Sequence, residues 1–150
     1  MAIKIQNFNQ SHKAQVLELS LCAWAPVFAG MEPAVPAYVY EAFYPHGWRT
    51  RQASDIKAYL DSDGSDVWVA VDGGVLLGWI GVRLHPEDRM GELYILAVDP
   101  AHQRRGIGKA LIDFALARMR ASGMDIAMVE TGDDPGHAAS RAAYENTGFE

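Results

Sequence analysis

Residues Leu93–Leu111 read LYILAVDPAHQRRGIGKAL, and this stretch decides the fold. Its apolar first part predicts a strand over Gly91–Val98, ended by Asp99-Pro100. A helix follows from about Gly106 to Ala121, and Gly123 stops it. A strand that passes through a turn into a helix can hold an anion, because the first helical N–H groups are unpaired and the helix dipole favours negative charge there.

The turn itself strengthens the prediction of a phosphate site. Gly106 and Gly108 let the backbone come close to a ligand, while Arg104, Arg105 and Lys109 add positive charge. 

Two well-known phosphate loops do not fit these residues. A magnesium-nucleotide loop needs glycine at position 103 and serine or threonine at 110, where the chain has Gln103 and Ala110. A dinucleotide-binding loop needs a third glycine at position 111, which is Leu111.

Outward from this stretch, the pattern predicts one α+β domain around a mixed sheet. The short connections between Val67 and Val98 predict an antiparallel meander, and a strand-helix-strand crossover makes the next strand parallel to Gly91–Val98. The predicted strands are Ala2–Asn7, Val67–Val71, Val75–Arg83, Gly91–Val98 and Asp125–Thr131. The other predicted helices are Ser11–Trp24, with Asn9 as N-cap and Ala14, Leu17, Leu21 and Trp24 on one face, Gln52–Leu60 and His137–Asn146; short helical pieces are expected among the prolines from Pro26 to Pro45.

Two motifs together resemble one enzyme family. The run Gln103-Arg104-Arg105-Gly106-Ile107-Gly108 matches Gln/Arg-x-x-Gly-x-Gly/Ala, and Tyr144 begins a Tyr-x-x-x-Gly-Phe segment 38 residues after Gly106. With this element order, the chain resembles the GNAT superfamily of N-acetyltransferases. The resemblance implies a GNAT-like α+β fold in a single domain, residues 1–150, with a mixed central β-sheet flanked by helices on both faces. It also implies that the family's usual C-terminal strands are missing.

The resemblance further implies acetyl-CoA as cosubstrate. Its pyrophosphate would rest on the backbone amides of Arg104 through Lys109, and its pantetheine arm would pair with the exposed backbone of Leu96 and Val98. This requires the strand Gly91–Val98 to diverge from Asp125–Thr131. The donor-binding residues are expected to be Leu96, Ala97, Val98, Gln103, Arg104, Arg105, Gly106, Ile107, Gly108, Lys109, Ala110 and His137; His137 stands where many relatives carry asparagine.

Two residues are the candidates for catalysis. An amine near pKa 10 needs about 4 kcal/mol to become neutral at pH 7, and Glu92, on the expectation that it shares a face with Leu96, would take its proton. Tyr144 matches the family's frequent general acid. The alternative for Glu92 is a surface glutamate without a catalytic role, and the alternative for Tyr144 is an aromatic residue that only packs between the last helix and the sheet. The aromatic residues between Trp24 and Trp48 could flank a cationic acceptor or form core and lid.

The composition disfavours several kinds of ligand and location for this protein. A net charge of −6 disfavours nucleic acid, and five scattered histidines with a lone Cys22 predict no metal site and no covalent thiol intermediate. The N-terminus lacks a signal sequence, so a cytoplasmic protein without membrane association is expected. The predicted activity is acetyl transfer to a primary amine by direct attack on the thioester. The alternative is a non-catalytic acyl-CoA-binding regulatory module. For the missing strands, either the sequence omits the end of the domain or a neighbouring chain completes the sheet, and a homodimer is expected.

Overall fold

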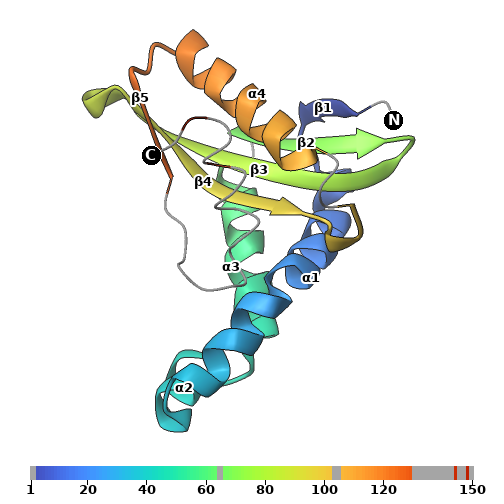
Figure 1. Cartoon of the computed structure of the whole chain (residues 1–150), viewed down its shortest axis with the longest axis vertical. Helices are drawn as coiled ribbons and strands as arrows, with labels where there is room; N and C mark the ends of the chain where they lie inside the picture. The colour runs from blue at the N-terminus through green and yellow to red at the C-terminus, as the bar shows by residue number, and fades with distance from the viewer. Residues whose placement is uncertain (1–2, 64–65, 103–105, 130–143, 145–147, 149–150) are drawn as a thin grey trace.

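A five-stranded sheet forms the centre of the computed structural model, which describes residues 3–63, 66–102, 106–129, 144 and 148. The strands lie in chain order: β1 (Lys4–Asn7), β2 (Val67–Asp72), β3 (Val75–His85), β4 (Met90–Val98) and β5 (Ile126–Val129). Strands β1 to β4 are antiparallel, and β5 pairs parallel to β4 (Figure 1). The predicted meander and crossover, and with them the mixed sheet, are confirmed.

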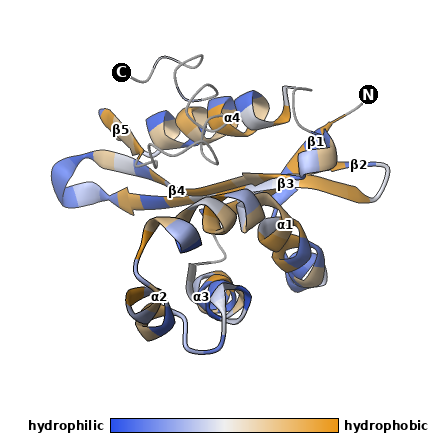
Figure 2. Ribbon diagram, turned by 60° about the horizontal axis from the view of Figure 1, so that its bottom comes forward, coloured by the Kyte–Doolittle hydropathy of each residue, from blue (hydrophilic) through white to orange (hydrophobic). Residues whose placement is uncertain are grey.

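Helices cover both faces of this sheet, as predicted. Figure 2 shows α1 (Lys13–Met31), α2 (Ala37–Phe43) and α3 (Trp48–Asp63) on one side and α4 (Ile107–Ala121) on the other. Each face has its own core. The core under α1 and α3 contains Val16, Leu19, Tyr59, Leu60, Val69, Trp79 and Ala97, and the core under α4 contains Leu77, Ile80, Val82, Leu93, Ile107, Leu111, Ala115 and Met119. Short 3-10 turns occupy Gln10–His12, Glu32–Ala34, Pro86–Asp88 and Pro100–His102.

Helix α1 differs from its prediction in two respects. It continues through Pro26 to Met31, and its buried residues are Val16, Leu19, Ser20 and Phe28, whereas the expected Ala14 is exposed. Asn9 caps the preceding 3-10 turn rather than α1, by accepting a hydrogen bond from the Ser11 amide at 2.9 Å. The segment Gln10–Ala34 has the length and apolar composition of a membrane span. In its first half, Val16 and Leu19 pack in the core under α1 and α3.

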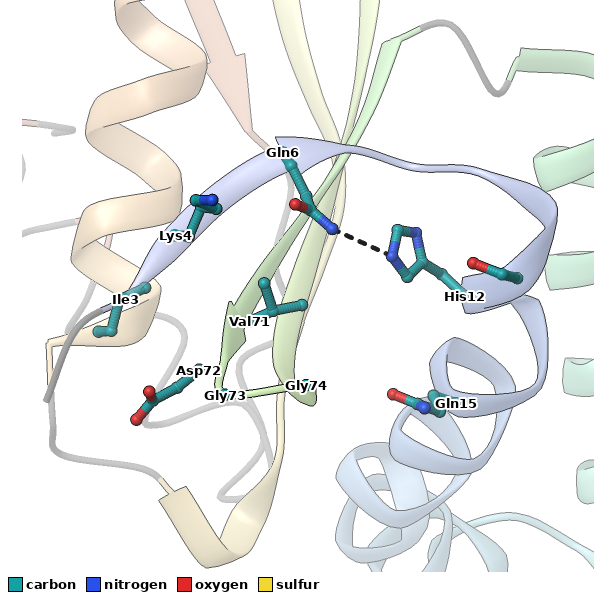
Figure 3. A pocket seen from close by; sticks show the side chains of 10 residues that line it. Ile3, Lys4, Gln6, His12, Gln15, Val71, Asp72, Gly73 and Gly74 are labelled. Carbon is teal, nitrogen blue, oxygen red and sulfur yellow. Dashed lines mark hydrogen bonds between the residues drawn. The ribbon is translucent and has the colours of Figure 1, made fainter.

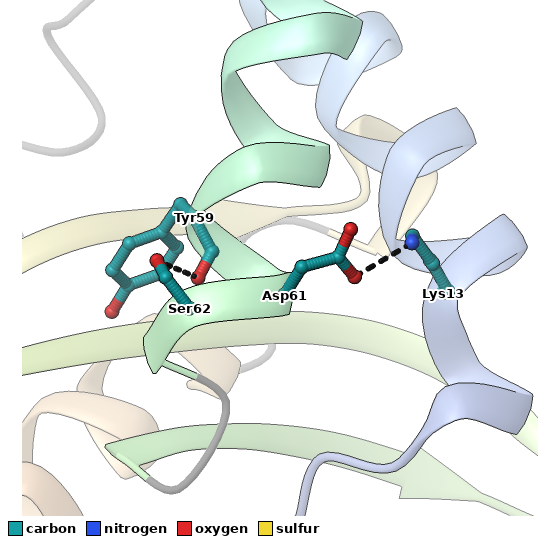
Figure 4. Close-up of polar contacts among 4 residues, drawn as sticks. All are labelled: Lys13, Tyr59, Asp61 and Ser62. Carbon is teal, nitrogen blue, oxygen red and sulfur yellow. Dashed lines mark hydrogen bonds and ion pairs between the residues drawn. The ribbon is translucent and has the colours of Figure 1, made fainter.

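A buried hydrogen bond connects α1 to the sheet. The Trp79 indole donates to the Ser20 hydroxyl at 2.8 Å, and that hydroxyl donates to the Val16 carbonyl at 2.7 Å. Both Ser20 and Trp79 are fully buried. An ion pair between Lys13 and Asp61, 2.8 Å long, joins α1 to α3 at the surface (Figure 4).

We expect Ser20→Ala to lower the free energy of unfolding by about 1–3 kcal/mol, because it leaves the Trp79 N–H buried without an acceptor. Denaturant titration followed by tryptophan fluorescence measures this loss. Ser62→Ala is the matched control, since the Ser62 hydroxyl donates only to the carbonyl of Tyr59 at 3.1 Å in an exposed position (Figure 4). Equal effects of the two substitutions would contradict the expectation.

Candidate active site

Strand β4 is paired differently on its two sides. It pairs with β3 along its whole length, but with β5 only from Met90 to Leu93. Within the described residues, no strand lies beside Tyr94–Val98 on the β5 side. The described part of β5 ends at Val129, which pairs with Leu93.

The backbone of Leu96 and Val98 points to that open side. The Asp99 amide donates to the Leu77 carbonyl of β3 at 2.9 Å, and the register pairs Val98 with Gly78. Backbone groups of successive residues in a strand point alternately to opposite edges. The backbone N–H and C=O groups of Ala97 and Asp99 are therefore directed toward β3. Those of Leu96 and Val98 are directed away from β3. Their N–H and C=O groups are placed to pair with an extended ligand.

A β-bulge at Tyr94 corrects one prediction. Val82 pairs with Leu93 and Gly81 with Ile95, so Tyr94 is an extra residue in β4. Leu93 and Leu96 both pack in the core under α4, three positions apart. Glu92 therefore lies on the opposite face from Leu96. The expectation that the two share a face is wrong, because the bulge breaks the two-residue period.

Glu92 lies instead on the face that carries α3. Its carboxylate is 18% exposed and contacts the His85 ring nitrogen at 3.1 Å. Directly across the strand pair, the Arg83 guanidinium lies 3.6 Å from the centre of the Tyr94 ring and 5.4 Å from that of Tyr59. A partly accessible carboxylate thus lies in the part of β4 that pairs with β5.

The turn after β4 leads directly into the first turn of α4. Asp99 orders its start, since its carboxylate accepts from the Ala101 amide at 2.9 Å and its carbonyl accepts from the His102 amide at 2.8 Å. Gly106 has φ +78°, a left-handed conformation that glycine adopts without steric cost. Among the described residues, the first backbone hydrogen bond of α4 runs from the Ala110 amide to the Gly106 carbonyl at 3.0 Å. In general, the amides of the first helical turn have no carbonyl within the helix to pair with.

The predicted donor residues after β4 differ in their exposure. Ile107 is buried in the core under α4, which leaves only its backbone for a ligand, whereas Gly108 and Ala110 are half-buried. Lys109 is exposed and forms an ion pair with Asp113 at 2.7 Å, so its ammonium lies along the helix. Gln103, Arg104, Arg105 and His137 lie outside the described residues.

Tyr144, the candidate acid, is 8% exposed and packs in the core under α4. Burial raises the pKa of its phenol to about 12. The phenol therefore carries its proton throughout the physiological range, and it is also one of the packing residues of this core.

The aromatic residues expected near the acceptor mostly pack against one another. The rings of Phe28 and Trp48 stack with centres 4.5 Å apart, and Tyr44 meets Phe28 edge-on at 5.5 Å. Tyr38 and Phe43 remain exposed. The cluster of Phe28, Tyr44 and Trp48 connects the end of α1 with α2 and α3, so these rings serve mainly to pack the three helices together.

One hollow among the described residues lies elsewhere. It measures about 770 Å³ between β1, the turn that joins β2 to β3, and the start of α1, where Gln6 contacts His12 at 3.2 Å (Figure 3). Two strands separate β1 from β4. This hollow is therefore separate from the open edge. The described residues contain no cluster of metal-binding side chains.

Comparisons with known proteins agree with this arrangement. Residues 36–149 match the model of the acetyltransferase (GNAT) family. A mycothiol acetyltransferase of Streptomyces coelicolor is 34% identical over 99 residues, which are 66% of this chain and 31% of the relative. The chain thus spans about a third of that relative's length.

Two solved structures share the fold. The PaiA N-acetyltransferase of Thermoplasma acidophilum, in complex with coenzyme A, has a TM-score of 0.72 at 19% identity, and the match covers 100% of this chain and 91% of that one. A GNAT family acetyltransferase of Brucella melitensis, in complex with acetyl-CoA, has a TM-score of 0.68 at 21% identity, covering 99% and 83%.

Proposed function

The chain belongs to the GNAT family of acetyltransferases, and we propose on this premise that it transfers an acetyl group from acetyl-CoA to a primary amine. The observation that carries the proposal is the open half of β4, whose Leu96 and Val98 backbone groups face a side without a strand in the described residues. The start of α4, whose first amides would hold the pyrophosphate, follows β4 in the chain. An extended chain that ends in a diphosphate, as coenzyme A does, fits the two features together.

In this proposal the pantetheine arm pairs with Leu96 and Val98, beside Ala97. The pyrophosphate rests on the segment from Gln103 to Ala110. An amide at the open edge polarises the thioester carbonyl, as in an oxyanion hole.

The amine attacks the thioester directly. Glu92 takes one proton of the acceptor ammonium, and the new C–N bond forms as the C–S bond breaks. The Tyr144 hydroxyl donates a hydrogen bond to the departing thiolate, which then takes up the second proton that the nitrogen releases. Cys22 takes no part, because it lies exposed on α1 and the direct route needs no thiol nucleophile.

The proposal includes a cellular setting and an assembly. We place the reaction in the cytoplasm and propose a homodimer that covers the outer side of β5. The support for the dimer is the exposure of Ile126, which is 58% accessible on a strand with no outer neighbour among the described residues.

A calorimetric titration with coenzyme A tests the donor site. We expect saturable binding by the wild type and an affinity at least about tenfold lower in Leu96→Pro, because proline lacks the N–H directed to the open edge. Leu96→Ala is the matched control, since it loses the same side chain but keeps the N–H. Equal affinities of the two variants would contradict pairing at Leu96.

Thiol release from acetyl-CoA, assayed with a panel of small-molecule and peptide amines, tests the reaction. Amine-dependent release identifies the acceptor class. Binding of coenzyme A without release for any amine would instead favour the non-catalytic acyl-CoA-binding module.

A further inference from the structure

Glu92 has a hydrogen-bond partner at the end of the neighbouring strand. His85 is the last residue of β3, and Glu92 is the third residue of β4. The register pairs His85 with Met90 and Arg83 with Glu92, so His85 and Glu92 are diagonal neighbours on one face of the sheet. The His85 Nε2 and Glu92 Oε1 atoms are 3.1 Å apart.

The chemistry of the pair fixes which atom donates. An ionised carboxylate can only accept hydrogen bonds, so the proton lies on Nε2 of His85. This bond occupies one of the two oxygens of Glu92. The second oxygen, Oε2, is then the atom that can accept a proton from an acceptor ammonium.

Because the pair is partly buried, the hydrogen bond between His85 and Glu92 contributes more free energy than the same bond at the surface would. The Glu92 side chain is 18% exposed, compared with 34% for His85. A hydrogen bond to a charged group contributes more when water competes less for it. On the same face, the guanidinium of Arg83, which the register pairs with Glu92, lies 3.6 Å from the centre of the Tyr94 ring, which gives this end of the strand pair a defined side-chain arrangement.

We propose that His85 is a positioning residue for the base: its Nε2–H holds Oε1 of Glu92 and thereby presents Oε2 to the acceptor ammonium. The inference rests on the proposed function, because it requires Glu92 to be the base. His85 acts through Glu92 and does not contact the substrate itself. A glutamate without this partner would sample other rotamers, and fewer encounters with the amine would be productive.

Steady-state kinetics of two His85 variants test the role. We expect His85→Leu to lower kcat about ten- to hundredfold, the value of one hydrogen bond to a charged group, with coenzyme A affinity unchanged. His85→Gln should stay within about threefold of wild type, because its amide N–H can donate to the same oxygen. His46→Leu, an exposed histidine between α2 and α3, is the control. A His85→Leu variant with wild-type kcat, or equal losses in the leucine and glutamine variants, would overturn the proposal.

A double-mutant cycle separates positioning from a general structural role. In the Glu92→Gln background, His85→Leu should cause no further loss of kcat, because the base through which it acts is already gone. Additive losses would overturn the proposal. If the wild-type chain itself releases no thiol with any amine, the proposed function fails and the inference fails with it; a working wild type with additive losses removes the inference alone.

Discussion

Glu92→Gln is expected to lower kcat for acetyl transfer about 10²- to 10⁴-fold at pH 7 while coenzyme A affinity stays unchanged. The range is the usual contribution of a general base. Glutamine keeps the size of the side chain and can still accept the His85 hydrogen bond, so the substitution removes the proton acceptor with little change in packing. Steady-state kinetics together with a coenzyme A titration measure the two quantities separately.

The pH dependence of this variant gives a second check. Without a base, only the neutral fraction of the amine can react, and that fraction rises tenfold per pH unit below the amine's pKa. The deficit of Glu92→Gln should therefore shrink as pH rises toward 10. Glu87→Gln, the same chemical change at an exposed turn residue, is the control. Unchanged turnover in Glu92→Gln would exclude this residue as the base.

The fold followed from the sequence where short-range patterns decide it. The β-branched, apolar run Val67–Val71 and the turn Asp72-Gly73-Gly74 locate the hairpin, and the helical pattern after Gly106 locates α4. The same reasoning failed at Pro26, which was expected to end α1. A single proline removes one helical hydrogen bond, and packing of Phe28 against Trp48 and Tyr44 accompanies the continued helix.

The site was only partly predictable for a related reason. The open edge at Leu96 and Val98 was expected from the family resemblance and stays a prediction, because the described part of β5 ends at Val129, opposite Leu93. The bulge at Tyr94 has no signature in composition, yet it moves Glu92 to the other face of the sheet. The His85–Glu92 contact depends on the register of two strands and was therefore missed. Pairing the residues of β3 and β4 across the turn at Pro86 could have suggested the His85–Glu92 contact.

The raised pKa of Tyr144 limits what this residue can do as an acid. A phenol with a pKa of about 12 is a weaker acid than a thiol, whose usual pKa is near 8.5. Complete transfer of its proton to a thiolate would be uphill by about 5 kcal/mol. The role that fits is hydrogen-bond donation to the sulfur as negative charge develops, which requires only that the phenol remain protonated.

The raised pKa of Tyr144 also makes the free energy of unfolding depend on pH, and the sign of this dependence is known. The folded-state pKa lies above the unfolded value of about 10, so the unfolded chain loses its phenol proton first as pH rises. The contribution of Tyr144 to stability is therefore complete below pH 10 and is lost progressively between about pH 10 and 12. Phenylalanine at this position has no proton to lose, so the alkaline decline in the free energy of unfolding should be smaller in Tyr144→Phe.

Tyr144→Phe is accordingly expected to lower kcat about 10- to 100-fold, the value of one hydrogen bond to a developing charge, with coenzyme A affinity within about twofold of wild type. The ring remains, so the core under α4 keeps its packing, and thermal unfolding at pH 7 verifies this. Tyr38→Phe removes a hydroxyl from a side chain that is 76% exposed on α2 and should leave kcat unchanged. If Tyr144→Phe turns over like the wild type, the phenol only packs, and the departing thiolate takes its proton from water. If instead coenzyme A affinity and kcat fall together, Tyr144 shapes the donor site and the loss of turnover says nothing about proton donation.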